Sequence, residues 1–422
     1  MYSDKQRIDM LKAHVLINPQ KSDFSPSPVV TWLGHKFDVE RGVVSITEER
    51  VERLMKKVRK LEEKWPVVSA RDVAKVVGSV ISAALVFPQE GQFMTRFLQT
   101  VINYREERKY KWGQDFDVGD TEVADLAWTE LMFWRDTVRA RNSRRFVVEN
   151  KRCHLVWGDA GETGEGAHFD FGNGETVVYN GYDDDQSATS STERELSCIQ
   201  SVLMSAPHLV ANKEVVYVTD SISCHIIMGK GSKKRNLHLV AAACRGLARA
   251  LNVTLHTAWV PREYNQRADD ISKMVDHDDW FLTEEFFNKV ERLAGEKITV
   301  DAFADNRNAK VSKFYSKYWC PGTAGVDGLA HDWRGEVVLA VPPPALLVQT
   351  LLKFRKERSR GMLVFPECGT GLLGALWNSE KLRDGRVAEW KFRGLGRLAA
   401  NVNTMYNHKF EGIIVVVKLN FK

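Results

Sequence analysis

Cysteine is scarce in this chain of 422 residues, and its six cysteines show no disulfide or metal-binding spacing. No two of them form a Cys-x-x-Cys pair, and none lies in a block with histidine. A zinc site or a disulfide framework would need such spacing. The pattern predicts reduced thiols in an intracellular protein, cytoplasmic or nuclear and not secreted.

Long hydrophobic runs are also absent. No apolar run reaches membrane-spanning length, and residues Met1–Arg7 lack the apolar core of a signal peptide. The hydrophobic share of 44% and the charged share of 27% are those of an ordinary soluble protein. A net charge of +5 is compatible with nucleic-acid binding but is not evidence for it. We expect two to four domains and no membrane partner.

Helical periodicity dominates the first part of the chain. Apolar residues recur at i, i+3, i+4 and i+7 after Thr47, and Trp65-Pro66 ends that pattern. Ser69 and Asp72 resemble a capping box that opens a second helix. The expected elements are, in chain order, a helix over 8–15, a strand over 29–37, helices over 48–64 and 70–81, a charged link over 105–122 and a helix over 125–138.

The period changes at residue 151, where short apolar runs bounded by glycine predict strands. The expected elements are strands over 153–157, 165–171 and 175–180, a helix over 192–205, a strand over 214–219, helices after Asp220 and over 236–251, a strand over 253–260 and a last helix from about 265. This order predicts a mixed α/β sheet of five strands with helices on its faces. Residues 298–422 read as a further α/β region.

Four acidic residues stand out in the segment 151–280. Asp159 and Asp220 each close an expected strand, Glu195 lies on the helix between them, and Asp269 opens the last helix. Any one of them alone is more simply a turn cap or a solvent-facing side chain. Together, carboxylates on rigid elements are suited to holding a pair of hard divalent cations about 4 Å apart against a phosphate. The sequence therefore favours a metal-dependent phosphodiester hydrolase.

This segment resembles the ribonuclease H domain of retroelement polyproteins. The matching motifs are Trp157-Gly-Asp-Ala160, Thr192-Glu-Arg-Glu-Leu196, Tyr217-Val-Thr-Asp-Ser221 and Asn265-Gln-Arg-Ala-Asp-Asp-Ile-Ser272. The motifs select Glu195 over Glu193 and Asp269 over Asp270. The resemblance implies a ribonuclease H-like fold and hydrolysis of the RNA strand of an RNA–DNA hybrid.

The resemblance also implies the roles of the four carboxylates. Two Mg²⁺ ions would be held, with Mn²⁺ able to substitute. Asp159 would bridge both ions, Glu195 and Asp220 would hold one, and Asp269 would hold the other. The cellular enzymes carry a mobile histidine before the last helix, whereas this chain has Arg262-Glu-Tyr264 there. We therefore expect slower turnover.

The flanking segments extend the resemblance to a retrotransposon of the DIRS class, which carries a tyrosine recombinase. Residues 1–104 look like the end of a reverse-transcriptase palm followed by thumb and connection, and 105–150 like a linker and helix. The Tyr-x-Asp-Asp hairpin of a polymerase is missing, since Tyr182-Asp-Asp-Asp185 falls in a loop where a solvated turn is expected. We expect no polymerase activity, with fingers and palm supplied elsewhere in the same polyprotein.

Residues 281–422 resemble a Dam-type adenine-N6 methyltransferase domain with a Rossmann-like α/β fold. That family has Asp or Asn, then Pro-Pro and an aromatic residue, where this chain has Val341-Pro-Pro-Pro344. Neither Val341 nor Pro344 can hydrogen-bond through its side chain or stack like an aromatic ring. We expect a degenerate domain without methyl transfer. The alternative is an unrelated α/β tail with a proline-rich turn.

A basic turn lies between two expected helices of the nuclease-like segment. Its cations are Lys230, Lys233, Lys234 and Arg235. They can contact the phosphates of a hybrid duplex, or they can be solvated surface. The favoured function is a Mg²⁺-dependent ribonuclease H within a retrotransposon polyprotein. The alternative is an inactive, truncated or host-retained remnant that binds nucleic acid.

Overall fold

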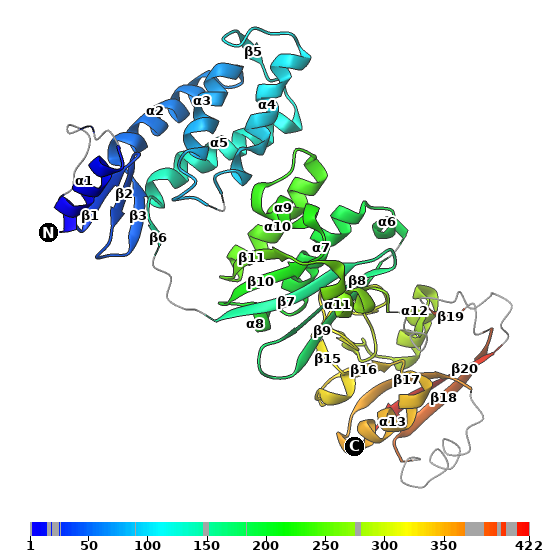
Figure 1. Ribbon diagram of the computed structural model, residues 1–422. Coiled ribbons are helices and arrows are strands. Elements are labelled where there is room, and N and C mark those ends of the chain that lie inside the picture. The colour runs from blue at the N-terminus through cyan, green and yellow to red at the C-terminus, as the bar shows by residue number, and fades with distance from the viewer. Residues whose placement is uncertain are drawn as a thin grey trace. The chain divides into compact units, whose positions relative to one another are not determined.

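The computed structural model describes residues 2–14, 18, 25, 27–88, 90–146, 152–182, 184–274, 280–367, 384–394, 398–401 and 412–421. The chain divides into two compact units, which are drawn in Figure 1. The first comprises Met1–Lys151 with Gly229–Arg235, and the second Arg152–Met228 with Asn236–Lys422. Within the described ranges, no helix has both the length and the apolarity to cross a bilayer. The five described cysteines are free thiols, and Cys368 lies outside these ranges.

The first unit combines a small sheet with a helical bundle. Its helices are α1 (Tyr2–Lys12), α2 (Glu48–Lys64), α3 (Ala70–Ile81), α4 (Arg96–Glu107) and α5 (Glu122–Ala140). Its strands are β1 (Val29–Trp32), β2 (His35–Asp38), β3 (Val43–Ile46), β4 (Val67–Ser69), β5 (Asp115–Asp117) and β6 (Arg144–Arg145). Strands β1, β2, β3 and β6 form one antiparallel sheet, and β4 pairs with β5.

Helices α2, α3 and α5 follow the sequence pattern, whereas α1 begins before the expected helix over 8–15, α4 was not expected, and the first strand differs from the prediction. The apolar positions of α2 are buried, and the Ser69 hydroxyl caps α3 by accepting a hydrogen bond from Asp72 N at 3.2 Å. The expected strand over 29–37 is instead a hairpin. Leu33 and Gly34 have φ angles of 47° and 76°, so the chain reverses between β1 and β2.

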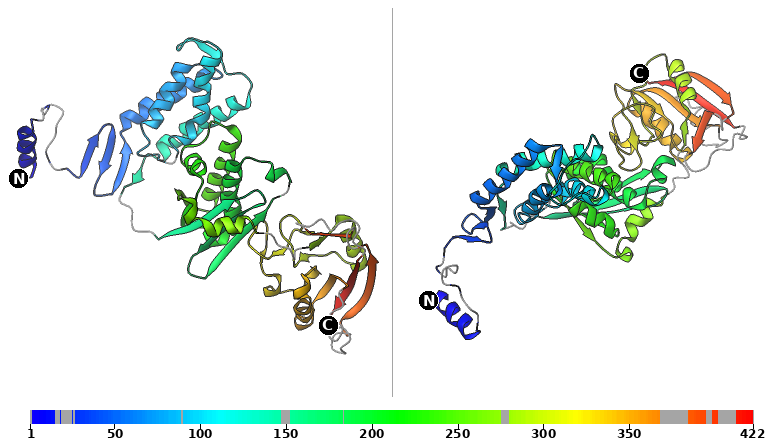
Figure 2. Two further views of the ribbon diagram at one scale, coloured as in Figure 1. Left: turned by 45° about the vertical axis from the view of Figure 1, so that its right-hand side comes forward. Right: turned by 90° about the horizontal axis from the view of Figure 1, so that it is seen from above.

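The nuclease-like part of the second unit is built on a mixed five-stranded sheet, drawn in green in Figures 1 and 2. Its strands are β7 (Cys153–Ala160), β8 (Gly164–Asp170), β9 (Glu175–Gly181), β10 (Glu214–Thr219) and β11 (Thr254–Trp259). The spatial order is β11-β10-β7-β8-β9. Strands β7, β10 and β11 run parallel, and β8 and β9 continue antiparallel. This confirms the predicted ribonuclease H-like sheet.

The helices of this part are α6 (Asp184–Ser187), α7 (Ser191–Ser205), α8 (Pro207–Val210), α9 (Ile222–Lys230), α10 (Arg235–Ala250) and α11 (Gln266–Ser272). Helix α11 packs directly on β8. A Cβ on Gly166 would lie 2.5 Å from Ser272 N, so only glycine permits this approach. The close contact fixes α11, and with it Asp269, against the sheet.

The C-terminal region has its own five-stranded sheet, in the order β13-β16-β17-β20-β18. Its strands are β13 (Val300–Asp301), β16 (Val337–Ala340), β17 (Arg360–Pro366), β18 (Arg386–Arg393) and β20 (Ile413–Asn420). Strands β13, β16 and β17 are parallel, and β20 is antiparallel to both β17 and β18. Helices α12 (Glu284–Ala294) and α13 (Leu347–Lys356) pack on this sheet. The expected Rossmann-like α/β region is therefore present.

Smaller elements complete the C-terminal region. They are strands β12 (Trp280–Leu282), β14 (Tyr315–Ser316), β15 (Gly325–Val326) and β19 (Ala399–Asn401) and the short 3-10 turns at Gly328–Ala330 and Pro344–Leu346. One loop of the region extends the nuclease sheet. Trp319 O accepts a hydrogen bond from Tyr179 N at 2.9 Å, and Trp319 N donates to Val177 O at 3.1 Å. The loop thereby pairs with β9, the edge strand.

Candidate metal centre

Three carboxylates meet at one edge of the nuclease sheet. Asp159 lies near the carboxyl end of β7, and Asp220 directly follows the parallel strand β10. Glu195 projects from α7, a helix whose first turn is capped by the Ser190 hydroxyl. Oxygen atoms of Asp159, Glu195 and Asp220 lie within 4.8 Å of one another. Parallel neighbouring strands bring their carboxyl ends to the same edge, which explains how residues so far apart in sequence converge.

These three residues, called here the acidic triad, carry unfavourable electrostatics. Asp159 and Glu195 are buried, and Asp220 is half-buried. Burial, reinforced by Asp159 and Asp220, raises the pKa of Glu195 to about 9. Burial likewise raises the pKa of Asp159, with Asp220 and Asp269 adding to the effect against a hydrogen bond from Ser272. Carboxylates crowded in this way favour either protonation or a bound cation.

The hydrogen bonds that reach the triad are few. The Ser272 hydroxyl lies 2.8 Å from Asp159 Oδ2 and 2.9 Å from Asp269 O. The Thr219 hydroxyl lies 3.4 Å from Glu195 Oε2. Among the described residues, no lysine or arginine forms an ion pair with the triad. Arg194 and Arg262 act on Glu195 and Asp159 only through their more distant charges, and these do not outweigh the effect of burial on the two pKa values.

Asp269 has a different environment, although it belongs to the same set of expected ligands. Arg262 Nη2 donates to its Oδ1 at 2.6 Å, and Lys273 Nζ donates to its Oδ2 at 2.5 Å. Burial alone would raise the pKa of Asp269, but the hydrogen bonds from Lys273 and Arg262 lower it overall. The charged form of Asp269 is thus stabilised, whereas the charged forms of Asp159 and Glu195 in the neighbouring acidic triad are destabilised.

The two expected ligands Glu195 and Asp269 differ in burial from the acidic residues Glu193 and Asp270 near them in the sequence. Glu195 and Asp269 are buried, whereas Glu193 and Asp270 are exposed or partly exposed. Glu193 accepts a hydrogen bond from Asn236, and Asp270 accepts one from Gln266. Of the four expected ligands, three converge and Asp269 is linked to Asp159 through Ser272. The assignment of each residue to an ion stays a prediction.

The four cations of the basic turn are all exposed. Lys230 ends α9, Lys233 and Lys234 lie in the loop, and Arg235 begins α10. The stretch Gly229–Arg235 groups with the first unit, where Arg235 forms an ion pair with Glu122. The charge of Arg235 is therefore partly compensated. Contact of this turn with phosphate stays a prediction.

The donor set of the triad fits a hard divalent cation. All its potential ligand atoms are carboxylate oxygens, and no cysteine or histidine belongs to the group. Oxygen-only sites of this kind select Mg²⁺ or Mn²⁺ over zinc. Both the donor chemistry and the raised pKa values of Asp159 and Glu195 agree with the expected cofactor.

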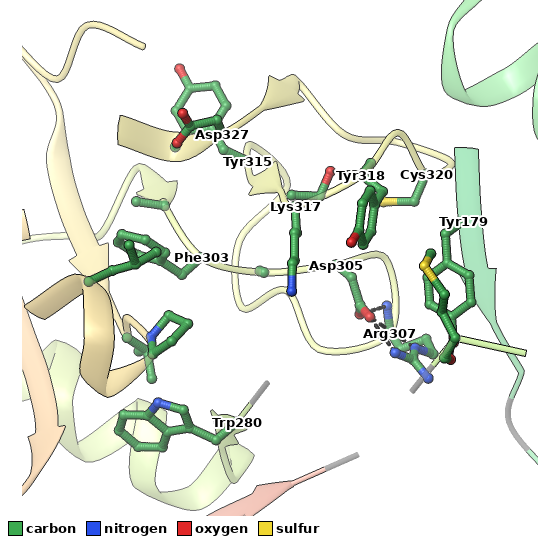
Figure 3. Close-up of a pocket in the computed structure, with 18 of the residues that line it drawn as sticks. Tyr179, Trp280, Phe303, Asp305, Arg307, Tyr315, Lys317, Tyr318, Cys320 and Asp327 are labelled. Carbon is green, nitrogen blue, oxygen red and sulfur yellow. Dashed lines mark hydrogen bonds and ion pairs between the residues drawn. The ribbon is translucent and has the colours of Figure 1, made fainter. Parts of the chain in front are cut away.

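A cavity of about 420 Å³ lies in the C-terminal region, at the carboxyl ends of β13 and β16. Its walls include the aromatic side chains of Trp280, Phe303 and Tyr318 (Figure 3). Val341 also lines it. Pro344 begins the short turn beside the cavity. The stretch Val341-Pro-Pro-Pro344 therefore lies at a preformed pocket, and its relation to a Dam-type motif stays a prediction.

Sequence reasoning gave no role to Arg262, Ser272 or Lys273. Ser272 was present in the matching motif, and its fixed spacing from Asp269 was the available signal. Arg262 was noted only as standing in the stretch where histidine was missing. Lys273 follows Asp269 by four residues, the helical spacing at which opposite charges meet. That spacing alone could have identified the pair.

Comparisons with known proteins give matches among solved structures alone. No protein-family model matches the chain, and no curated protein does. Among solved structures, the chain is similar to ribonuclease H1 of Halobacterium salinarum at 17% identity, covering 28% of this chain and 94% of that one, with a TM-score of 0.24. It is similar to the N-terminal ribonuclease H domain of rv2228c from Mycobacterium tuberculosis at 20% identity, covering 28% and 95%, with a TM-score of 0.23.

A longer but more divergent match is the foamy viral protease-reverse transcriptase in complex with an RNA/DNA hybrid. The identity is 10%, the match covers 65% of this chain and 36% of that one, and the TM-score is 0.24. The chain thus spans about a third of that viral protein. The fold of residues 152–274 is ribonuclease H-like on the strand order and connections described above.

Proposed function

We propose that this protein is a Mg²⁺-dependent nuclease of the ribonuclease H type, which hydrolyses the RNA strand of RNA–DNA hybrids. The observation that carries the proposal is the acidic triad, two of whose members are buried and with which no described lysine or arginine forms an ion pair. A fold does not retain such repulsion for stability, because protonating or replacing one carboxylate would relieve it. A site that binds cations against phosphate explains its presence.

In this proposal Asp159, Glu195, Asp220 and Asp269 hold two Mg²⁺ ions. When bound, these ions supply an activated water and stabilise the leaving oxygen of the phosphodiester. The chain itself supplies rigid positions: two strand ends, one capped helix, and α11 held against β8. Ser272 orients Asp159 from α11. The 2′-hydroxyls and shape of a hybrid distinguish its RNA strand.

We further propose that the chain is part of a retrotransposon polyprotein of the DIRS type. Residues 1–104 would be the end of a reverse-transcriptase palm with thumb and connection, and 105–150 a linker and helix. The hairpin and helices of the first unit support this assignment. Fingers and palm of the same polyprotein are the proposed partners, together with the hybrid contacted by Lys230, Lys233, Lys234 and Arg235.

Residues 281–422 are proposed to be a degenerate Dam-like methyltransferase domain. Its support is the parallel strands β13, β16 and β17 with a pocket at the carboxyl ends of β13 and β16, where Val341 would stand in place of a polar residue. We expect no transfer of a labelled methyl group to DNA. Transfer above a background without protein would contradict this part of the proposal.

The decisive experiment is cleavage of an end-labelled RNA–DNA hybrid in Mg²⁺ by the full chain. We expect cleavage of the RNA strand by the wild type, loss of cleavage in Asp220→Asn, and full cleavage in the matched control Asp270→Asn. The control alters an exposed aspartate that lies outside the triad. Absence of cleavage, or equal cleavage by Asp220→Asn, would favour the alternative of an inactive remnant that binds nucleic acid.

A further inference from the structure

Asp269 is held at both of its oxygens by cations from the two ends of its own helix. Arg262 lies in the 3-10 turn Arg262–Tyr264 that precedes α11, and Lys273 is the residue that ends α11. The Asp269 side chain is 5% exposed, whereas those of Arg262 and Lys273 are 68% and 53% exposed. The carboxylate is therefore fixed, and its two partners are free to turn toward solvent.

We propose that Arg262 and Lys273 form a cationic clamp on Asp269 that makes cation binding sequential. The acidic triad takes one ion directly, and a second ion reaches Asp269 only when the clamp opens. The clamp residues are positioning residues that tune the proposed nuclease site, so the inference rests on the proposed function.

The first step follows from competition for the same atoms. Arg262 occupies Oδ1 of Asp269 and Lys273 occupies Oδ2. A cation that used either oxygen would have to displace the ammonium or guanidinium group bonded to it. No such competitor pairs with the triad among the described residues. The two halves of the site therefore differ in the free energy of binding a cation.

The second step concerns how the clamp opens. Breaking an ion pair with a buried carboxylate costs free energy, and the hydration that the two largely exposed cations regain when they leave offsets part of that cost. The hydrogen bond to Asp269 and the charges of Asp269, Asp220 and Asp159 raise the pKa of Arg262, so it stays a cation. A phosphate group of a bound strand is an anion, as the Asp269 carboxylate is. It can accept two hydrogen bonds from the Arg262 guanidinium. Binding of the strand therefore favours release of Asp269.

The test is calorimetric titration of the full chain with Mn²⁺, and with Ca²⁺ in the presence of hybrid. The variant Arg262→Gln/Lys273→Gln removes both clamp charges and keeps polar side chains of similar length. The matched control is Arg267→Gln, since Arg267 lies on the same helix but pairs with Glu175. Arg262→Lys tests rescue by a conserved charge.

We expect the wild type to bind one Mn²⁺ at least about tenfold more tightly than a second. In the clamp variant the second affinity should rise about tenfold, a free-energy change of about 1.4 kcal/mol, and the first should stay within about twofold. The control should match the wild type, and Arg262→Lys should retain most of the asymmetry. Adding hybrid should strengthen the second Ca²⁺ site in the wild type more than in the clamp variant.

The outcomes separate this inference from the proposed function. Two equal sites in the wild type, or an unchanged second site in the clamp variant, would overturn the clamp without touching the nuclease proposal. Sequential binding that the clamp variant abolishes, without any cleavage of the hybrid, would support the clamp and refute the nuclease. A wild type that binds no Mn²⁺ would overturn both.

Discussion

Two of the buried glutamates, Glu130 in the first unit and Glu195 in the second, differ in what surrounds the buried carboxyl group. Glu130 of α5 reaches the first turn of α4, where it accepts hydrogen bonds from Phe97 N and from Leu98 N at 2.9 Å. The adjacent Thr95 makes no side-chain cap, so Glu130 caps α4 from another helix. Among the described residues, the Glu195 carboxyl group accepts one side-chain hydrogen bond, from the Thr219 hydroxyl at 3.4 Å, and it faces two other carboxylates.

Glu130 and Glu195 differ in which groups stabilise the buried carboxyl group. Backbone amides at a helix N-terminus stabilise a carboxylate, so Glu130 is complete within the chain. Burial nevertheless raises the pKa of Glu130 to about 8, against the effect of those amides. The pKa of Glu195 is raised to about 9 by burial and by like charges. In the proposed function, a bound cation would stabilise its carboxylate. A buried carboxylate identifies a site when its neighbours repel it.

The largest expected effect comes from Glu195→Gln. Cleavage of the hybrid in Mg²⁺ should fall about 10³-fold, as when one preorganised charge-stabilising group is removed. The free energy of unfolding in EDTA at neutral pH should rise, because Glu195, with a pKa of about 9, must take up a proton on folding and glutamine need not. Cleavage assays and urea unfolding measure the two effects. Loss of stability in EDTA would place Glu195 in the same structural class as Glu130 and break the comparison.

Glu130→Ala should have the opposite profile. The buried N–H groups of Phe97 and Leu98 would lose their acceptor, which costs about 2–3 kcal/mol of unfolding free energy. Hybrid cleavage by the folded protein should be unchanged. Urea unfolding and amide hydrogen exchange in α4 check this, with the exposed Thr129→Ala on the same helix as control. A stability equal to the wild type would show that water replaces the carboxylate.

The pH dependence of stability should sharpen the contrast. The folded-state pKa of Glu130, about 8, lies above the ordinary value of 4.5, so the protonated form is favoured on folding. Its contribution is fully present below about pH 4.5 and is lost as pH rises through about 8, by up to about 1.4 kcal/mol per pH unit. Hydrogen exchange in α4 between pH 5 and 9 measures it.

Glu130→Gln should abolish this dependence in α4, since glutamine does not titrate. The corresponding loss in α7, which carries Glu195, should disappear when Mg²⁺ is added, whereas that in α4 should persist. A dependence in α4 that vanishes with Mg²⁺, or one that survives Glu130→Gln, would contradict this account.

The smallest effect is expected at the basic turn. Lys233→Ala/Lys234→Ala should weaken hybrid binding a few-fold and reduce the slope of log K against log salt by about 1 to 2, because each phosphate contact releases counterions. Arg249→Ala, an exposed cation at the far end of α10, is the control. The measurement is the affinity for the hybrid in Ca²⁺ at several salt concentrations. An unchanged slope would assign these lysines to solvated surface.

Much of the nuclease sheet was predictable, because its strands are short apolar runs bounded by glycine. The motifs also distinguished Glu195 and Asp269 from Glu193 and Asp270. The hairpin at Leu33-Gly34 was missed because an apolar run continues through the turn. Strand β18 was missed because it carries charged residues along a largely exposed edge.

The electrostatic contrast could not be read from the sequence. Glu130 has the helical setting of any surface glutamate, and its role depends on where α4 begins in space. The clamp depends on the turn that brings Arg262 back to Asp269, seven positions further along the chain. Long-range contacts of this kind are set by tertiary packing, and periodicity does not encode them.

The backbone pairing of Trp319 with β9 has a consequence for variants that lack the C-terminal region. An exposed strand edge presents free N–H and C=O groups to other chains and promotes aggregation. Here a loop of the C-terminal region covers that edge. A deletion of the C-terminal region would leave the N–H and C=O groups of β9 unpaired at that edge and promote aggregation. Selection for solubility alone can therefore favour keeping this region, whatever its own activity.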